Sequence, residues 1–116
     1  MSSEQDRRRF LRVTLPNPVR GAVGSARIYV LDASMGGVRI AHQSALPAPG
    51  GFCRLEMATA EGPVKLDCEI VRTAVAQKPQ QLFHSGLQIV AADRQSAERL
   101  RSLCGEETPP PPEQNH

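Results

Sequence analysis

The sequence predicts an all-β domain with one C-terminal helix, built as a six-stranded antiparallel β-barrel. Six short segments carry β-prone or alternating residues; the clearest covers residues 64–72, where Val64, Leu66, Cys68 and Ile70 share one face. Tight turn signals separate these segments, and only the last stretch has helical spacing. Six strands in so short a chain favour a Greek-key or meander barrel, because closure removes most exposed edges.

Length and composition leave room for one domain. The chain has 116 residues, 40% of them hydrophobic but only 3% aromatic. Residues 1–6 are polar and residues 106–116 are rich in proline, so we expect both ends to be disordered and residues 7–105 to fold. No apolar stretch approaches the roughly 20 residues of a membrane span, and no secretory segment is present at the start. We therefore expect a cytoplasmic protein.

Three strands are expected in the first half of the chain. The first is interrupted: residues 13–15 and 19–23 are apolar, and Pro16-Asn17-Pro18 between them confines any strand to an edge or a bulge. Residues 26–31 and 37–41 form the second and third strands. A turn over residues 32–36 joins them.

The second half supplies three more strands and the helix. Residues 52–58 and 64–72 alternate as half-buried strands, and residues 61–63 connect them tightly. Residues 82–91 form the last strand, in which Gly86 indicates a bulge or a close approach. Asp93 is expected to cap a helix over residues 94–104, and Gly105 marks its end.

The cysteines and histidines do not form a metal-binding pattern. The three cysteines are Cys53, Cys68 and Cys104. They are odd in number, widely spaced and without a C-x-x-C pair, which favours small buried thiols in a reducing compartment. The three histidines show no ligand spacing either. We expect no metal and no cofactor.

Positive charge is concentrated at one place. The net charge is +2, and Arg7, Arg8, Arg9 and Arg12 supply +4, so the remaining residues sum to 2 − 4 = −2. A general nucleic-acid binder spreads its basic residues along a face, and a single-strand binder adds aromatic platforms. A short anionic ligand with two phosphates fits a single dense cluster better.

A second polar segment follows the second expected strand. Asp32 falls where that strand runs into a turn, and Ser34 lies two residues later, so extended geometry would place both side chains on one face. Gly36 and Gly37 allow positive φ and a close approach by another group. Alone, this pattern is typical of a hairpin connection. With the arginines it indicates a guanine nucleotide site, because a guanidinium fork matches both the guanine O6/N7 edge and phosphate oxygens.

The order and spacing of the two motifs resemble a known family. Arg8-x-x-x-Arg12 followed by Asp32-x-Ser34-x-x-Gly37 is similar to the PilZ domain family, which binds the bacterial second messenger cyclic di-GMP, and the likeness runs from about residue 7 to residue 103. The resemblance implies a six-stranded β-barrel with a C-terminal helix. It also implies a receptor, not an enzyme.

The resemblance assigns ligand contacts to both motifs. The implied binding residues are Arg7, Arg8, Arg9, Arg12, Asp32, Ser34, Gly36 and Gly37. In the family an arginine at the position of Arg7 accompanies an intercalated ligand dimer, which implies two cyclic di-GMP molecules per chain. By analogy, His84 and Ser85 line the rim of the ligand; an exposed strand position is the plainer interpretation of both.

The expected mechanism is the ordering of a mobile arm. Residues 1–12 would fold over the ligand against the Asp32 turn and present a new surface to an unidentified protein effector. The main alternative is a small β-barrel that binds nucleic acid through the same arginines. An enzyme has no organising motif here, and a ligand-blind interaction module is a fourth interpretation.

Overall fold

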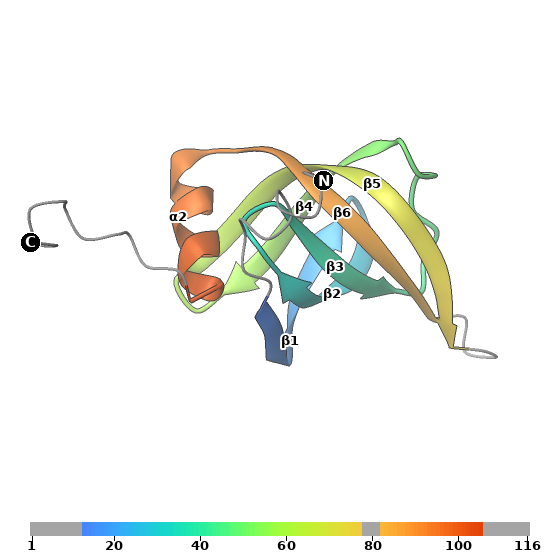
Figure 1. Cartoon of the computed structure of the whole chain (residues 1–116), viewed down its shortest axis with the longest axis horizontal. Helices are drawn as coiled ribbons and strands as arrows, with labels where there is room; N and C mark the ends of the chain where they lie inside the picture. Colours follow the sequence, from blue (N-terminus) through green and yellow to red (C-terminus); the bar gives the residue numbers. More distant parts are fainter. Residues whose placement is uncertain (1–12, 78–81, 106–116) are drawn as a thin grey trace, which may run out of the picture.

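A closed barrel of six antiparallel strands with one helix at its end makes up the described part of the chain (Figure 1). The computed structural model describes residues 13–77 and 82–105. The strands are β1 (Val13–Val23), β2 (Ala26–Ala33), β3 (Gly37–His42), β4 (Phe52–Thr59), β5 (Gly62–Gln77) and β6 (Leu82–Ala92), and the helix is α2 (Arg94–Leu103). The predicted fold class is confirmed. The expected disorder of residues 1–6 and 106–116 lies outside the described residues.

The strand order around the barrel is β1-β2-β3-β6-β5-β4. A simple meander is therefore excluded, because β3 pairs with β6 and β1 pairs with β4. The interior is filled by aliphatic side chains from every strand, among them Ile28, Ile40, Leu55, Leu66 and Ile70, each with no exposed surface. Alternation of inward apolar and outward polar residues places these side chains in one core.

The first strand is continuous, so the predicted interruption is wrong. β1 runs through the Pro16-Asn17-Pro18 segment, and its register against β2 shifts between Thr14 and Val19. Proline lacks an N–H but its fixed φ suits extended backbone, so the chain continues while the ladder skips this segment. The expected bulge is confirmed.

Other boundaries also differ from the prediction, by a single residue at the ends of β3, β4 and β6. β2 continues through Ala33, so Asp32 lies inside the ladder rather than in a turn. β5 is much longer than residues 64–72: it starts at Gly62 and ends at Gln77. α2 ends at Leu103, and Cys104 is its C-cap. β2 is longer than predicted because its last residues pair with both β1 and β3. β5 is longer because its last residues pair with β6, and this part of the strand extends beyond the barrel.

The barrel closes at a short junction between its first and fourth strands. Three residue pairs join them, Gly21 with Met57, Ala22 with Glu56 and Val23 with Leu55, and we call this junction the β1–β4 seam. A Cβ on Gly21 would lie 2.5 Å from the carbonyl oxygen of Glu56. Only glycine lets the two backbones approach this closely.

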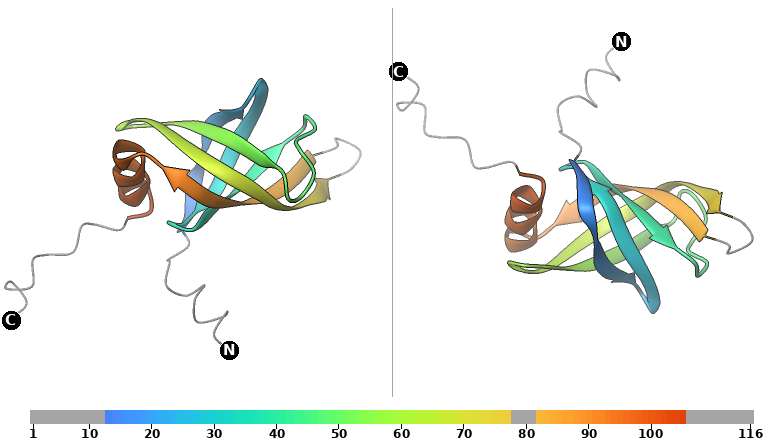
Figure 2. Two further views of the ribbon diagram at one scale, coloured as in Figure 1. Left: turned by 90° about the horizontal axis from the view of Figure 1, so that it is seen from above. Right: turned by 90° about the horizontal axis from the view of Figure 1, so that it is seen from below.

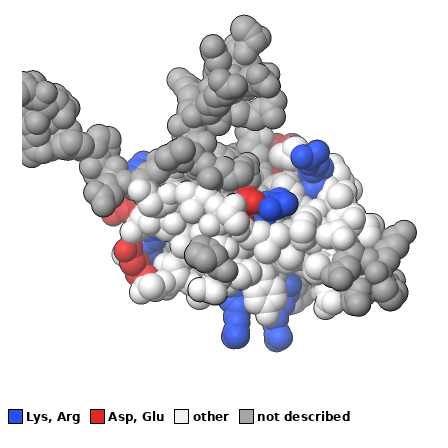
Figure 3. Space-filling view, turned by 60° about the horizontal axis from the view of Figure 1, so that its bottom comes forward, with Lys and Arg blue, Asp and Glu red and all other residues white. Residues whose placement is uncertain are grey.

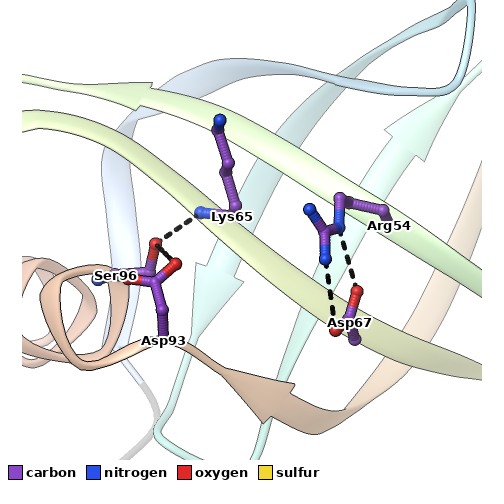
Figure 4. A network of polar contacts seen from close by, with 5 residues as sticks. All are labelled: Arg54, Lys65, Asp67, Asp93 and Ser96. Atoms are coloured by element: carbon purple, nitrogen blue, oxygen red, sulfur yellow. Dashed lines mark hydrogen bonds and ion pairs between the residues drawn. The ribbon is translucent and has the colours of Figure 1, made fainter.

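The helix covers one end of the barrel, opposite the end at which β5 finishes and β6 begins (Figure 2). Leu100 and Cys104 are buried in the core. At the helix start, Asp93 accepts hydrogen bonds from the backbone N–H and hydroxyl of Ser96, at 2.7 and 3.0 Å. The Ser96 hydroxyl in turn accepts a bond of 2.9 Å from the N–H of Lys65, which ties the helix to β5 (Figure 4). The predicted cap is confirmed, and no helix of the described residues is long and apolar enough to cross a membrane.

Candidate ligand-binding face

A bulge in β2 turns Asp32 to the outer surface of the barrel. Val30 pairs with Ile40, but the next pair is Asp32 with Arg39, so Leu31 is the additional residue. Paired residues of an antiparallel ladder share a face, and Arg39 points outward because Val38 and Ile40 are buried in the core. Periodicity alone does not reveal such a shift.

Asp32 and Arg39 form an ion pair on this face. Arg39 Nε donates to Asp32 Oδ2 at 2.7 Å. The carboxylate side is almost completely covered, with 4% of its side chain exposed, whereas 47% of the Arg39 side chain is exposed. The sequence interpretation missed Arg39, although its position between two buried aliphatic residues marks it as an outward basic side chain.

Ser34 holds the β2–β3 connection together. Its hydroxyl accepts from the N–H groups of Gly36 and Gly37, at 3.2 and 3.1 Å, and donates to the Gly37 carbonyl at 3.2 Å. β2 ends at Ala33, so the extended geometry expected to set Asp32 and Ser34 side by side does not persist. The hydroxyl is engaged in shaping the turn.

Gly37 is required by the neighbouring strand. A Cβ at this position would lie 2.5 Å from the Leu87 carbonyl oxygen of β6. The close approach expected for a glycine here is thus made by backbone. At Gly86, by contrast, a Cβ would meet only Arg72 Cγ, at an ordinary 3.9 Å. A bulge does lie opposite Gly86, but its additional residue is on β5, between Ile70 and Arg72, and not in the last strand as expected.

A chain of hydrogen bonds joins polar side chains of β3, β6 and β5. His42 Nδ1 donates to the Ser44 carbonyl at 2.8 Å, and in the neutral ring His42 Nε2 then accepts from the Ser85 hydroxyl at 2.7 Å. Ser85 also bonds to Thr73 at 2.7 Å and has no exposed surface. Ser85 therefore cannot line a ligand rim, and the exposed strand position expected for it is wrong because its side chain points inward. His84 is half-buried.

Cys53 and Cys68 are free thiols, and no group of three metal-binding side chains occurs within residues 13–77 and 82–105. Burial raises the pKa of the Cys68 thiol to about 12. Burial also raises the pKa of Cys53, which is only half-buried. Both groups are thus held as thiols at neutral pH, the form with low reactivity.

A cleft of the described barrel lies at the β1–β4 seam. It has a volume of about 760 Å³ and is lined by residues of β1, β2, β4 and β5, including Arg20, Arg27, Tyr29 and Glu56. None of Asp32, Ser34, Gly36 and Gly37 lines it. The candidate site therefore lies outside this cleft. On the face of the molecule drawn in Figure 3, charged side chains are scattered and do not gather into one patch.

The predicted arginines Arg7, Arg8, Arg9 and Arg12 lie outside the described residues. The strand that follows them is nevertheless informative, because Val13 pairs with Ala33 and Thr14 pairs with Asp32. The described part of β1 therefore begins beside Asp32 and Ala33 of β2.

Comparison with family models decides the family. The model of the PilZ domain matches residues 6–106. The chain belongs to the PilZ domain family. A comparison with curated proteins found no match.

Solved structures share the PilZ fold with this chain. The inhibitor of motility MotI (DgrA) of Bacillus subtilis has a TM-score of 0.66 at 17% identity, over 84% of this chain and 49% of that one. YcgR of Escherichia coli, in complex with c-di-GMP, has a TM-score of 0.64 at 16% identity, over 84% of this chain and 44% of the YcgR chain. The PilZ domain of YcgR with c-di-GMP has a TM-score of 0.62 at 17% identity, over 85% of this chain and 89% of that domain's chain. The chain spans less than half of the MotI and YcgR chains.

Proposed function

We propose that this PilZ domain is a cytoplasmic receptor for cyclic di-GMP and not an enzyme. The pairing of Thr14 with Asp32 carries the proposal, because the strand that follows the arginine segment begins beside Asp32, a covered carboxylate on the outer face. Membership of the family and the c-di-GMP complexes of the structurally similar YcgR support the choice of ligand.

In this proposal the two motifs divide the contacts. Arg8 and Arg12 bind the guanine edge and phosphate oxygens through their planar forks, and Arg7 and Arg9 add contacts to a second stacked ligand. Asp32 accepts from the guanine N–H groups or holds an arginine. Each charge-assisted bond contributes roughly 1.5–3 kcal/mol, or about one to two decades of affinity.

The β2–β3 turn provides the surface beneath the ligand. Ser34 fixes that turn through its bonds to Gly36 and Gly37, and the two glycines keep it free of side chains. The turn thereby contributes its shape to the ligand face, and Ser34 acts by holding that shape.

Ligand binding is converted into a signal by the arginine segment. The ligand neutralises the mutual repulsion of the arginines and fixes residues 1–12 against the barrel, which creates a composite surface for a protein effector. A ligand acts in this way because it binds the ordered arrangement more tightly than the free one.

Isothermal titration calorimetry tests the proposal. Cyclic di-GMP, GTP and a short oligonucleotide are titrated into the native chain and into Arg8→Ala, Arg12→Ala and Asp32→Asn, with Arg94→Ala as the control. Arg94 is an exposed arginine on the helix, so its loss removes the same charge elsewhere. We expect saturation by two cyclic di-GMP molecules, and a loss of about one to two decades for each motif arginine.

Two outcomes would contradict the proposal. One is the absence of heat with cyclic di-GMP from a chain whose circular dichroism shows that it is folded. The other is binding to the oligonucleotide that grows with its length and falls steeply with salt, which would indicate a nucleic-acid-binding barrel. A stoichiometry of one would remove the stacked pair but keep the receptor.

A further inference from the structure

The candidate site continues across two more strands as a single row of paired residues. Asp32 of β2 pairs with Arg39 of β3, Arg39 pairs with Gly86 of β6, and Gly86 pairs with Arg72 of β5. These positions are far apart in sequence, so no motif contains them together. The row starts at the covered carboxylate and ends at the strand that projects beyond the barrel.

All members of the row lie on the outer face. Ser85, the residue before Gly86, is completely buried, so the neighbouring position Gly86 faces outward. A Cβ on Gly86 would lie 3.9 Å from Cγ of Arg72, which places the Arg72 side chain on the same face, alongside the glycine. Gly86 therefore leaves a bare strip of backbone between two outward arginines.

Both arginines retain donors for a ligand. Arg39 contacts Asp32 through Nε, and in the described residues its terminal nitrogens make no hydrogen bond or ion pair. Arg72 is exposed, and the described part of the chain provides it with no hydrogen-bonding or ionic partner. Neighbouring strands are about 4.8 Å apart, so the backbones of the two arginines are separated by about 10 Å.

We propose that Arg39, Gly86 and Arg72 form a phosphate-binding strip that extends the ligand face from Asp32 onto β5. The inference rests on the proposed cyclic di-GMP function and adds these contacts to it. Guanidinium forks bind phosphate oxygens bidentately, and a glycine between them lets the phosphodiester approach the backbone. Arg39 contacts Asp32 and ligand together, which orients its fork.

The test compares Arg72→Ala and Gly86→Glu with Arg94→Ala by calorimetric titration of cyclic di-GMP at two salt concentrations. Arg72→Ala should weaken binding by about three- to tenfold and reduce the dependence of affinity on salt. Gly86→Glu fills the strip and places an anion between the arginines, so it should weaken binding at least as much. Arg94→Ala should bind like the native chain.

Amide chemical shifts locate the effect independently of affinity. On addition of cyclic di-GMP to the native chain, the amide signals of Arg39, Gly86 and Arg72 should shift, whereas those of Arg54 on β4 should not. Gly86→Ala shows whether a side chain at this position disturbs folding, because its Cβ makes only an ordinary contact and the variant should fold like the native chain.

The outcomes separate this inference from the receptor proposal. If the native chain binds cyclic di-GMP while both strip variants bind within twofold of native and the strip amides do not shift, the strip is wrong and the receptor stands. If the folded native chain binds no cyclic di-GMP, both are wrong.

Discussion

Two arginine–aspartate pairs on the barrel surface have similar closest distances and very different surroundings. Arg39 and Asp32 approach to 2.7 Å between β3 and β2, and Arg54 and Asp67 approach to 3.0 Å between β4 and β5 (Figure 4). Only 4% of the Asp32 side chain is exposed, compared with 49% of Asp67. We call the surroundings of the first pair the covered face and those of the second the open face.

The difference in exposure indicates which polar side chains of this barrel do more than keep its surface soluble. On the open face, water solvates both partners, and exposed pairs of this kind contribute little to stability. On the covered face, the carboxylate has lost most of its water and depends on specific donors. Outward strand positions normally keep their hydration, so a covered outward carboxylate distinguishes a site from ordinary surface.

The largest expected effect comes from the glycine that supports the covered face. Gly37→Ala places a Cβ 2.5 Å from the Leu87 carbonyl oxygen, so β3 and β6 must separate, and we expect a loss of about 1–3 kcal/mol in the free energy of unfolding. In the matched variant Gly86→Ala the new Cβ makes only an ordinary van der Waals contact, so the free energy of unfolding should change by less than about 0.5 kcal/mol. Urea denaturation measures both, and equal effects would contradict the packing argument.

The next effect separates two turns that use a hydroxyl in the same way. Ser34 supports the β2–β3 turn, and Thr59 donates to the Gly62 carbonyl at 2.7 Å and accepts from the N–H of Glu61 at 3.2 Å in the β4–β5 turn. Ser34→Ala leaves the buried N–H of Gly37 without its acceptor and should cost about 1–2 kcal/mol. Thr59→Val should cost less, because the Glu61 N–H is exposed to water. A larger loss for Thr59→Val would reverse the comparison of the two faces.

Double-mutant cycles compare the two ion pairs directly. Arg39→Ala, Asp32→Ala and their combination should give a coupling energy of about 1–2 kcal/mol in thermal or urea unfolding, since the covered carboxylate loses one charged donor when Arg39 is replaced. The cycle of Arg54 and Asp67 should give no coupling beyond experimental error. Equal coupling in the two cycles would show that burial of Asp32 does not strengthen its pair.

The smallest effect concerns pH at the helix cap on the open face. Hydrogen bonds from the backbone N–H and then the hydroxyl of Ser96 lower the pKa of Asp93. A lowered carboxyl pKa stabilises the fold above the ordinary range of about pH 4 and loses this contribution as pH falls through the lowered value. The Tm of Asp93→Ala should thus lie below that of the native chain at pH 7, and the gap should narrow in acid. A gap that widens in acid would contradict this assignment.

Local patterns predicted much of the fold. The alternation of residues 64–70 and the N-cap Asp93 each report a preference that the backbone satisfies nearby, and both are confirmed. The continuation of β5 to Gln77 left no such signal, because residues 71–76 are exposed and show no inward and outward alternation. Pairing with β6 holds them extended.

The candidate site was predicted in part, for a related reason. Asp32, Ser34 and Gly37 are close in sequence, and their turn chemistry could be expected. Arg39 becomes the partner of Asp32 through the bulge at Leu31, which shifts the ladder by one residue and leaves no mark in the hydrophobic pattern. The contacts of Arg8 and Arg12 with a ligand stay a prediction.

The small number of residue pairs in the β1–β4 seam has a consequence for where this barrel opens locally. Eight residue pairs join β4 to β5, whereas three join β1 to β4. Opening costs least where the fewest hydrogen bonds must break, so amide protons of the Gly21 segment should exchange with solvent ahead of those on β4 and β5. β1 also begins beside Asp32, so a ligand that binds at the start of β1 would reduce local opening at the β1–β4 seam.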